Sequence, residues 1–236
     1  MTIAEKLIRN KNDLDVISSE VDSQADLIAQ LQDMADNLPD ASGSDEDNML
    51  YYASNIWQTY KDVVFPENYA LTIHLAKPGT IYHAFMNATN LKSIKIITDD
   101  TESTFNLMQA FREATSVEVI DLSECSREVA SADYMLFQAN NLKKVIGALD
   151  MSNCTSLNYT FFASVLEEIE IVPGTIKVNA RFNSAKLTQK SIESIIDGLA
   201  DLTGSDAQTI TLNGVGRSLT EAQQARIAAK NWLIAY

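Results

Sequence analysis

The chain has 236 residues, of which 46% are hydrophobic, and a formal net charge of −14 from 18 Lys and Arg against 32 Asp and Glu. This length and composition predict a folded protein with a sizeable core. The acidity argues against nucleic-acid binding, which needs basic patches. No apolar run approaches the ~20 residues of a membrane span, and the first residues lead into no signal-peptide core. We therefore expect a soluble protein that inserts into no membrane and is not exported by the usual signal route.

A heptad repeat of apolar residues covers residues 3–38 and predicts a coiled-coil stalk over residues 1–38. One seam position holds Leu7, Leu14, Val21, Ile28 and Ala35, and the other holds Ile3, Asn10, Ile17, Gln24, Leu31 and Leu38. The residues expected to make the oligomer contacts are Ile3, Leu7, Asn10, Leu14, Ile17, Val21, Gln24, Ile28 and Leu31. We expect a parallel homotrimer, although this seam does not decide between two and three strands. The alternative is a single amphipathic helix packed on the body.

Residues 39–48 have the composition of a linker, with proline, glycine, serine and like charges close together. The apolar residues that follow stand at helical spacing: Leu50, Ala53, Trp57 and Tyr60. This stripe predicts a short helix within residues 49–80, which form the entry to the repeats.

A phrase that recurs four times, at intervals of 24 to 26 residues, dominates residues 81–186. Its copies are Phe85, Ala88, Leu91, Ile94 and Ile96; Phe111, Ala114, Val117, Ile120 and Leu122; Leu136, Ala139, Leu142 and Val145; and, for the second half, Ala163, Leu166, Ile169 and Ile171. Equal spacing of this kind predicts stacked units that bury their apolar faces against one another. We predict an α/β fold, a solenoid with a parallel strand ladder. The side chains expected inside it are Phe85, Phe111, Leu136, Ala139 and Ala163.

Two cysteines, Cys125 and Cys154, occupy matching places in two of these repeats. Matching places in stacked units predict a row of side chains along the interior. We expect buried free thiols there rather than a disulfide or a reactive pair.

The loops between the repeats differ in length and composition, so we expect ligand specificity to lie in them. The candidate contact residues are Asp99, Asp100, Glu102, Arg127 and Glu128. A competing surface is the exposed face of the strands, which carries Lys92, Lys95, Glu118, Lys143, Lys144, Glu168 and Glu170. A solvated face is the favoured interpretation of those charges.

The last 50 residues, 187–236, predict a cap of two helix-strand units that closes the stack. Its expected elements are a helix N-capped by Thr188 with Gly204 past its end, a strand over 208–212, a helix over 222–230 with a capping box from Ser218 to Glu221, and a strand over 232–236.

The sequence offers poor material for catalysis. The only histidines, His74 and His83, belong to no metal-binding motif. The turn at Gly214 lacks the third glycine of a dinucleotide-binding loop. Glu167 and Glu168 are adjacent on an expected strand and point to opposite faces, unlike a glycosidase pair. We therefore expect no enzyme activity, no metal and no cofactor.

Several tracts resemble the irregular leucine-rich repeats called BspA-like, in a group of proteins encoded in prophages of Gram-positive bacteria. They are the repeat phrase itself, the opening Met-Thr-Ile-Ala-Glu-Lys-Leu, the tracts 56–60 and 187–196, the Thr-Ile-Thr-Leu strand and the Asn-Trp-Leu-Ile ending at residues 231–234. The combination of opening heptapeptide and closing cap is more specific than the loosely constrained repeats.

The resemblance implies a non-catalytic virion protein of the tail, the baseplate or a fibre, soluble in the host cytoplasm before assembly. Its expected partners are other virion proteins, bound through the N-terminus, and a host cell-surface protein or polysaccharide. A purely structural tail or baseplate spacer is the alternative. A bacterial surface adhesin and a polysaccharide-degrading enzyme are weaker ones.

Overall fold

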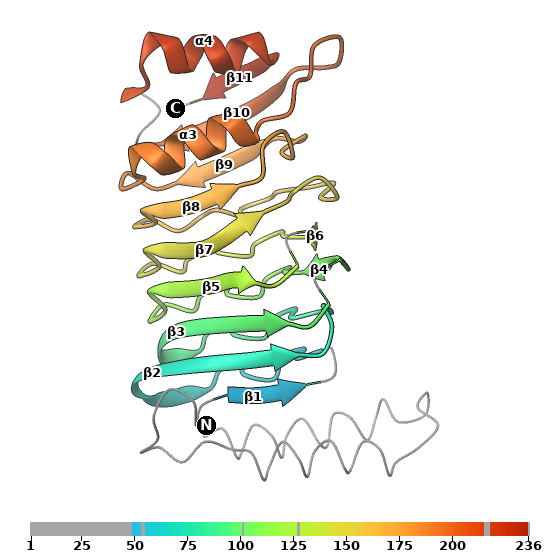
Figure 1. Ribbon diagram of the computed structural model, residues 1–236. Helices are drawn as coiled ribbons and strands as arrows, with labels where there is room; N and C mark the ends of the chain where they lie inside the picture. The colour runs from blue at the N-terminus through green and yellow to red at the C-terminus, as the bar shows by residue number, and fades with distance from the viewer. Residues whose placement is uncertain (1–48, 53–54, 101, 127, 215–217, 236) are drawn as a thin grey trace.

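The structure is a computed structural model that describes residues 49–52, 55–100, 102–126, 128–214 and 218–235, and these form an α/β fold as predicted (Figure 1). A six-stranded parallel sheet has the order β1 (Met49–Tyr52), β2 (Val64–Leu75), β3 (Thr89–Thr98), β5 (Val119–Glu124), β7 (Lys144–Leu149) and β8 (Glu168–Ile171). The other elements are the pair β4 (Phe105–Asn106) and β6 (Val129–Ser131), the parallel strands β9 (Ala180–Asn183), β10 (Gln208–Asn213) and β11 (Trp232–Ala235), and the helices α3 (Gln189–Gly198) and α4 (Glu221–Ala229). The predicted stalk with its nine oligomer-contact residues, and the linker, lie outside the described residues.

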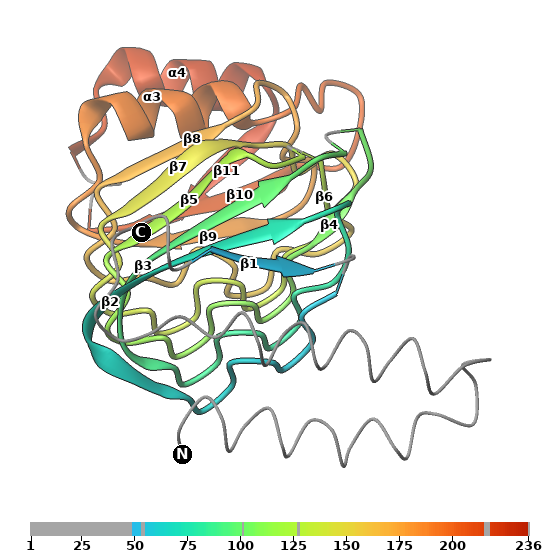
Figure 2. The ribbon, with the colours of Figure 1, turned by 60° about the horizontal axis from the view of Figure 1, so that its bottom comes forward.

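Each repeat unit stacks on the next by parallel pairing at two places. Along the sheet, Ile94 pairs with Ile120 and Ile120 pairs with Val145, which are matching positions of the repeated phrase. On the opposite side, the turn of each unit donates main-chain hydrogen bonds to the next, as from Phe85 N to the Ala110 oxygen at 2.9 Å. Figure 2 shows the strands on one side of the stack and the turn segments below them. The parallel pairing that the repeat spacing predicts is therefore confirmed.

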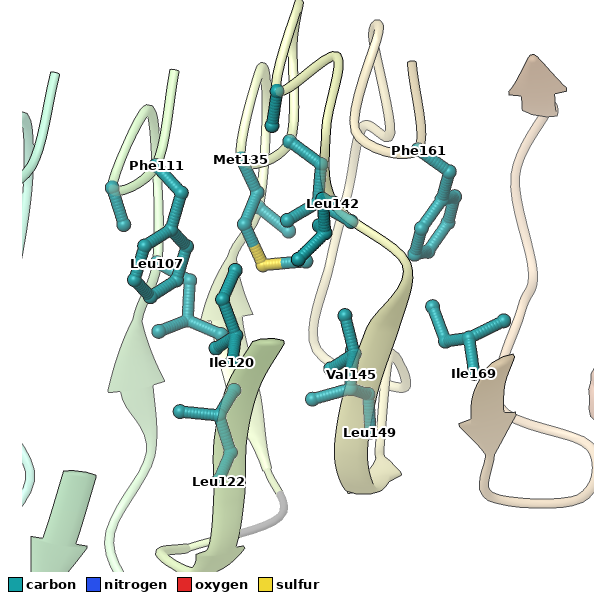
Figure 3. Packing of buried hydrophobic residues seen from close by; sticks show 14 of the residues in the cluster. Leu107, Phe111, Ile120, Leu122, Met135, Leu142, Val145, Leu149, Phe161 and Ile169 are labelled. Carbon is teal, nitrogen blue, oxygen red and sulfur yellow. The ribbon is translucent and has the colours of Figure 1, made fainter. Parts of the chain in front are cut away.

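The core fills the space between the strands and the turns. The five side chains predicted to lie inside, Phe85, Phe111, Leu136, Ala139 and Ala163, are all fully buried. In Figure 3, Phe111 and Met135 from the turns meet Ile120 and Val145 from the strands. The interior aromatic rings also stack along the axis: Tyr60 on Phe85 and Phe85 on Phe111 at 5.4 Å, and Phe161 on Phe182 at 4.2 Å. The core is thus one continuous column that links every unit.

The predicted helix within residues 49–80 is wrong for the part that the structure describes. Residues 49–52 form strand β1, in which Leu50 and Tyr52 are buried and Tyr51 is exposed, and residues 57–62 form turns. Trp57, which a helical stripe would bury, is 47% exposed. The physical reason is that Tyr60 is the interior aromatic of one more repeat unit, 25 residues before Phe85.

The first helix of the cap begins as predicted, with Thr188 accepting a hydrogen bond from Ser191 N. It ends at Gly198, earlier than Gly204 suggests, and Gly204 (φ 85°) lies in a later turn. Hydroxyls of α3 close the edge of the sheet, because Ile169 N and Ile171 N of β8 donate to Ser191 Oγ at 3.0 Å and Ser194 Oγ at 2.9 Å. The helix therefore takes the place of a seventh strand.

The N-cap of the second helix of the cap lies two residues after the predicted one, at Thr220 instead of Ser218. Thr220 is the N-cap, its side chain accepts from Gln223 N at 3.2 Å, and Gln223 Oε1 accepts from Thr220 N at 2.9 Å. Leu219 is buried just before the N-cap, which sets where the chain enters the helix. The prediction for Ser218 and Glu221 is corrected accordingly. The strands β10 and β11 are confirmed, and β9 is an addition that the sequence did not indicate.

Candidate functional site

The loops that follow β3, β5 and β7 lie side by side, because the carboxyl ends of parallel strands share one edge of a sheet. We call this edge the loop edge, and it comprises the described residues 99–100, 102–104, 125–126, 128 and 150–153. Main-chain hydrogen bonds join successive loops: Phe105 N donates to the Glu128 oxygen at 2.8 Å, and Val129 N donates to the Asp150 oxygen at 2.9 Å. The short strands β4 and β6 pair in parallel beside these bonds, with a register shift between Phe105 and Asn106. The loop edge is thus an ordered surface built from successive repeat units.

Asp99, one of the predicted contact residues, is engaged by two side chains of neighbouring strands. Its Oδ1 lies 2.6 Å from His74 Nε2, and its Oδ2 accepts a hydrogen bond from the Tyr51 hydroxyl at 3.5 Å. The Tyr51 and His74 rings meet edge to face at 4.9 Å. This group fastens the edge strand β1 to β2 and β3. His74, which the sequence suggested to be an ordinary histidine, is its central member.

Asp100 shapes its own loop. It accepts hydrogen bonds from the Ser103 hydroxyl at 2.5 Å, from Glu102 N at 2.8 Å and from Ser103 N at 3.1 Å. These bonds, led by that of the hydroxyl, lower the pKa of the Asp100 carboxyl, so the group stays ionised. Asp100 is therefore a structural residue of the loop edge.

The remaining predicted contact residues are Glu102, Glu128 and Arg127. The side chains of Glu102 and Glu128 are exposed, and Glu128 Oε2 accepts from Asn153 Nδ2 at 3.3 Å. Arg127 lies outside the described residues. The loop edge thus brings the described candidates onto one surface, on which Glu102 and Glu128 are exposed and Asp99 and Asp100 make the internal contacts described above.

The charged face of the strands is neutralised by pairing along the stack. Glu118 accepts from Lys92 and from Lys143, the latter at 2.9 Å, and these lysines lower its pKa. The other pairs are Lys95 with Glu124 at 2.6 Å, Lys144 with Glu168 at 2.7 Å, and Lys190 with Glu170. Exposed pairs of this kind contribute little to stability. Their arrangement favours the solvated face that the sequence suggested.

One cavity opens on the strand face where β7 and β8 lose register. Lys144 pairs with Glu168 and Ala148 pairs with Glu170, so β7 bulges between these pairs. The cavity has a volume of about 230 Å³ and is lined by this bulge, by β8 and by the start of α3. Gly147 (φ 99°) makes the bulge possible, since a Cβ there would lie 2.8 Å from the main chain of Leu122. Two Lys–Glu pairs frame the cavity and leave no net charge at its rim.

A group of aromatic and arginine side chains lies on the turn side of the stack, and the sequence analysis missed it. We call it the turn stripe: Arg112, Tyr134, Phe137, Tyr159, Phe162 and Arg181. Tyr159 is 43% exposed and Arg181 is exposed, while the others are half-buried. The signal that could have found it is the spacing of 25 residues, which relates Tyr134 to Tyr159 and Phe137 to Phe162.

Two buried thiols and one half-buried histidine lie within the stack. Cys125 and Cys154 are free and buried, as predicted, with Cys125 Sγ donating to the Ile96 oxygen at 2.8 Å, and burial raises the pKa of both thiols to about 12. His83 Nε2 lies 2.7 Å from Gln109 Oε1, and burial lowers the pKa of this histidine. Among the described residues, no three His, Cys, Asp or Glu side chains gather closely enough to hold a metal ion.

Comparison with known proteins found no matching family model, no matching curated protein and no matching solved structure. None of the helices that the structure describes is long and apolar enough to cross a membrane.

Proposed function

We propose that this protein is a leucine-rich-repeat-like solenoid of the BspA-like kind and a non-catalytic component of a phage virion, in the tail, the baseplate or a fibre. Residues 1–38 form a parallel homotrimeric coiled coil that joins other virion proteins. The body formed by the repeats attaches the particle to a protein or polysaccharide of the host surface. The resemblance in the sequence supports the virion assignment, and the loop edge supports attachment.

The observation that carries the proposal is the order of the loop edge. Its loops are held by main-chain bonds between successive units, such as that from Phe105 N to the Glu128 oxygen. A preorganised surface loses little conformational entropy when it binds. Exposed side chains such as Glu102 and Glu128 can vary without disturbing the stacked strands beneath them. Three such surfaces on one stalk would add avidity to weak single contacts.

A second candidate function, a structural spacer between two tail proteins, is favoured by the internal contacts of Asp99 and Asp100. Asp99 holds β1 on the sheet and Asp100 fixes the conformation of its loop, and such internal contacts suit a rigid structural component. A spacer requires a stable loop edge but no exposed side chains that bind a ligand.

Binding of fluorescently labelled full-length protein to intact Gram-positive cells separates the two. The double variant Glu102→Ser with Glu128→Ser removes two exposed carboxylates and keeps the bonds of Asp99 and Asp100. The matched control, Glu168→Ser with Glu170→Ser, removes two carboxylates from the strand face. Attachment through the loop edge predicts reduced cell binding for the first variant and unchanged binding for the second. A wild-type protein that binds no cells would contradict attachment and leave the spacer.

A further inference from the structure

We propose that the turn stripe binds a linear polysaccharide that carries carboxylate or phosphate groups. The inference rests on the proposed attachment function and names both a ligand class and a surface for it, separate from the loop edge. Four aromatic rings from two successive repeat units form the middle of the stripe, and one arginine stands at each end.

The rings hold one another in fixed positions. Tyr134 stacks on Tyr159 with centroids 5.2 Å apart, and Phe137 stacks on Phe162 at 5.6 Å. The two stacks meet edge to face, with Phe137 and Tyr159 at 5.5 Å and an interplanar angle of 86°. Side chains locked in this way lose little rotamer freedom on binding. The stripe is therefore a preformed, partly exposed aromatic surface.

The fold itself does not require these rings. The interior aromatic positions are filled by other residues, such as Phe111 and Phe161, which are fully buried. Units nearer the N-terminus carry Gln58, His83 and Gln109 where the stripe has Tyr134 and Tyr159; all five residues have φ between 52° and 58°. Large side chains are uncommon in this left-handed region. At the equivalent positions of other units, glutamine adopts the same left-handed backbone conformation, so the backbone does not require a tyrosine there. The two tyrosines therefore point to a role on the surface.

The arginines give the stripe its charge preference. The Arg112 guanidinium carbon lies 5.6 Å from the Phe137 ring centre, and that of Arg181 lies 5.3 Å from the Phe162 ring centre. Arg112 also donates to Glu113, whereas Arg181 donates to the side-chain amide oxygen of Asn213 and has no carboxylate partner among the described residues. A guanidinium binds carboxylate and phosphate groups in a bidentate manner. The chain as a whole carries a net charge of −14, which repels an anion at long range, so the preference for an acidic ligand rests on the local guanidinium groups of Arg112 and Arg181.

The repetition of the stripe favours a polymer of sugars over a folded protein. Successive units advance by the strand spacing of about 4.8 Å, and the ring pairs recur at 5.2 and 5.6 Å along the same direction. A linear polysaccharide offers the same ring and hydroxyl groups at each of its own steps, so it can contact the two units of the stripe alike. A folded partner needs roughly 20–30 residues on each side of its interface, far more than the six of the stripe.

Native affinity electrophoresis of the full chain tests the proposal, with polygalacturonate, poly(glycerol phosphate) or neutral dextran cast in the gel. The double variant Tyr134→Gln with Tyr159→Gln introduces glutamine, the residue that a neighbouring unit carries at the equivalent position 109. The fold should therefore persist, and circular dichroism checks this. His83→Gln is the matched control outside the stripe. We expect at least one acidic polymer, and not dextran, to retard the wild type. The double variant should bind about tenfold more weakly, the control should bind unchanged, and Arg181→Gln should weaken binding and its dependence on salt.

The proposal is overturned if neither acidic polymer retards the wild type, if dextran retards it equally, or if the double variant binds like the wild type. Assays of binding to intact cells distinguish this proposal from the proposed attachment function. If the stripe variants bind cells like the wild type, the stripe is not the binding surface, but the attachment function stands. If an acidic polymer retards the protein but the protein binds no cells, the stripe binds polysaccharide and the attachment function is wrong. Loss of cell binding after protease treatment of the cells would identify a protein partner instead, against this proposal.

Discussion

Truncation of Phe111 to alanine is the sharpest test of the repeat register. Phe111 is fully buried in the middle of the stack, and its ring lies 5.4 Å from that of Phe85 with an angle of 4° between the planes. The repeated phrase places this ring at the interior position that Phe85 fills in the preceding unit. If that register is right, the substitution leaves a cavity in the column that joins the units.

The expected loss in the free energy of unfolding is about 3–5 kcal/mol, the usual cost of emptying a buried phenylalanine site. Two features place the value in the upper part of this range. The variant also loses a stacked aromatic pair, worth about 0.5–1.5 kcal/mol. In addition, the main-chain bonds from Phe85 N to the Ala110 oxygen and from Phe111 N to the Met135 oxygen hold the neighbouring turns, so the site cannot readily collapse.

Urea unfolding of the full chain, followed by circular dichroism, measures this loss. Trp57→Ala is the matched control, since it removes a larger aromatic side chain that is 47% exposed, and it should cost about 1 kcal/mol or less. A loss below about 1 kcal/mol for Phe111→Ala would show that the register is wrong. A smaller dependence of the free energy on urea would instead show that the units on either side of the cavity unfold separately.

Three further predictions concern the edge of the sheet, the thiols and the stalk. Replacing Ser191 or Ser194 by alanine leaves an N–H group of β8 without its acceptor, and each change should cost about 1–3 kcal/mol in urea unfolding; an unchanged midpoint for both would contradict the capping role of α3. Cys125 and Cys154 should resist a thiol reagent at pH 8 until the chain unfolds, because burial raises their pKa from 9.0 to about 12. The unfolded chain loses these protons at lower pH than the folded chain, so the free energy of unfolding should fall as the pH rises above 9 toward 12. Rapid labelling of the folded chain would refute their burial. Light scattering should give three times the 26.1 kDa of one chain, and a single-chain mass would rule out the trimer formed by residues 1–38.

The sequence predicts the part of the fold that depends on exact repetition. Phe85 and Phe111 identify the interior because each is followed by small and apolar residues at the same offsets. The preceding unit does not match this pattern. Its interior aromatic residue Tyr60 and its strand residue Leu71 are separated by two more residues than the equivalent Phe85 and Ile94. The structure absorbs the extra length in register shifts around Tyr69. The pattern therefore failed where an insertion separates the turn from its strand.

Candidate sites were harder to predict because their partners come from other units. Nothing near Asp99 in the sequence indicates that it contacts His74, 25 residues earlier, or Tyr51 on the edge strand. Local composition marks Asp100 as a free acidic group, while its bonds to Ser103 make it part of the loop framework. A comparison of residues one repeat apart would have found both the contact with His74 and the stacked pair of Tyr134 and Tyr159.

The pairing of every unit with its neighbours by one repeated translation bears on how such a chain can evolve. If a whole unit of about 25 residues were gained or lost, the units on either side would still pair through the same positions of the repeat. Ile94 with Ile120 and Ile120 with Val145 are two such equivalent pairs. A shorter insertion has to be accommodated as a bulge, as happens before Leu71. Recombination between related genes can therefore change the reach of the protein in whole steps. Point substitutions can meanwhile alter the loop edge, the strand face or the turn stripe one at a time, because each draws on different positions of the repeat.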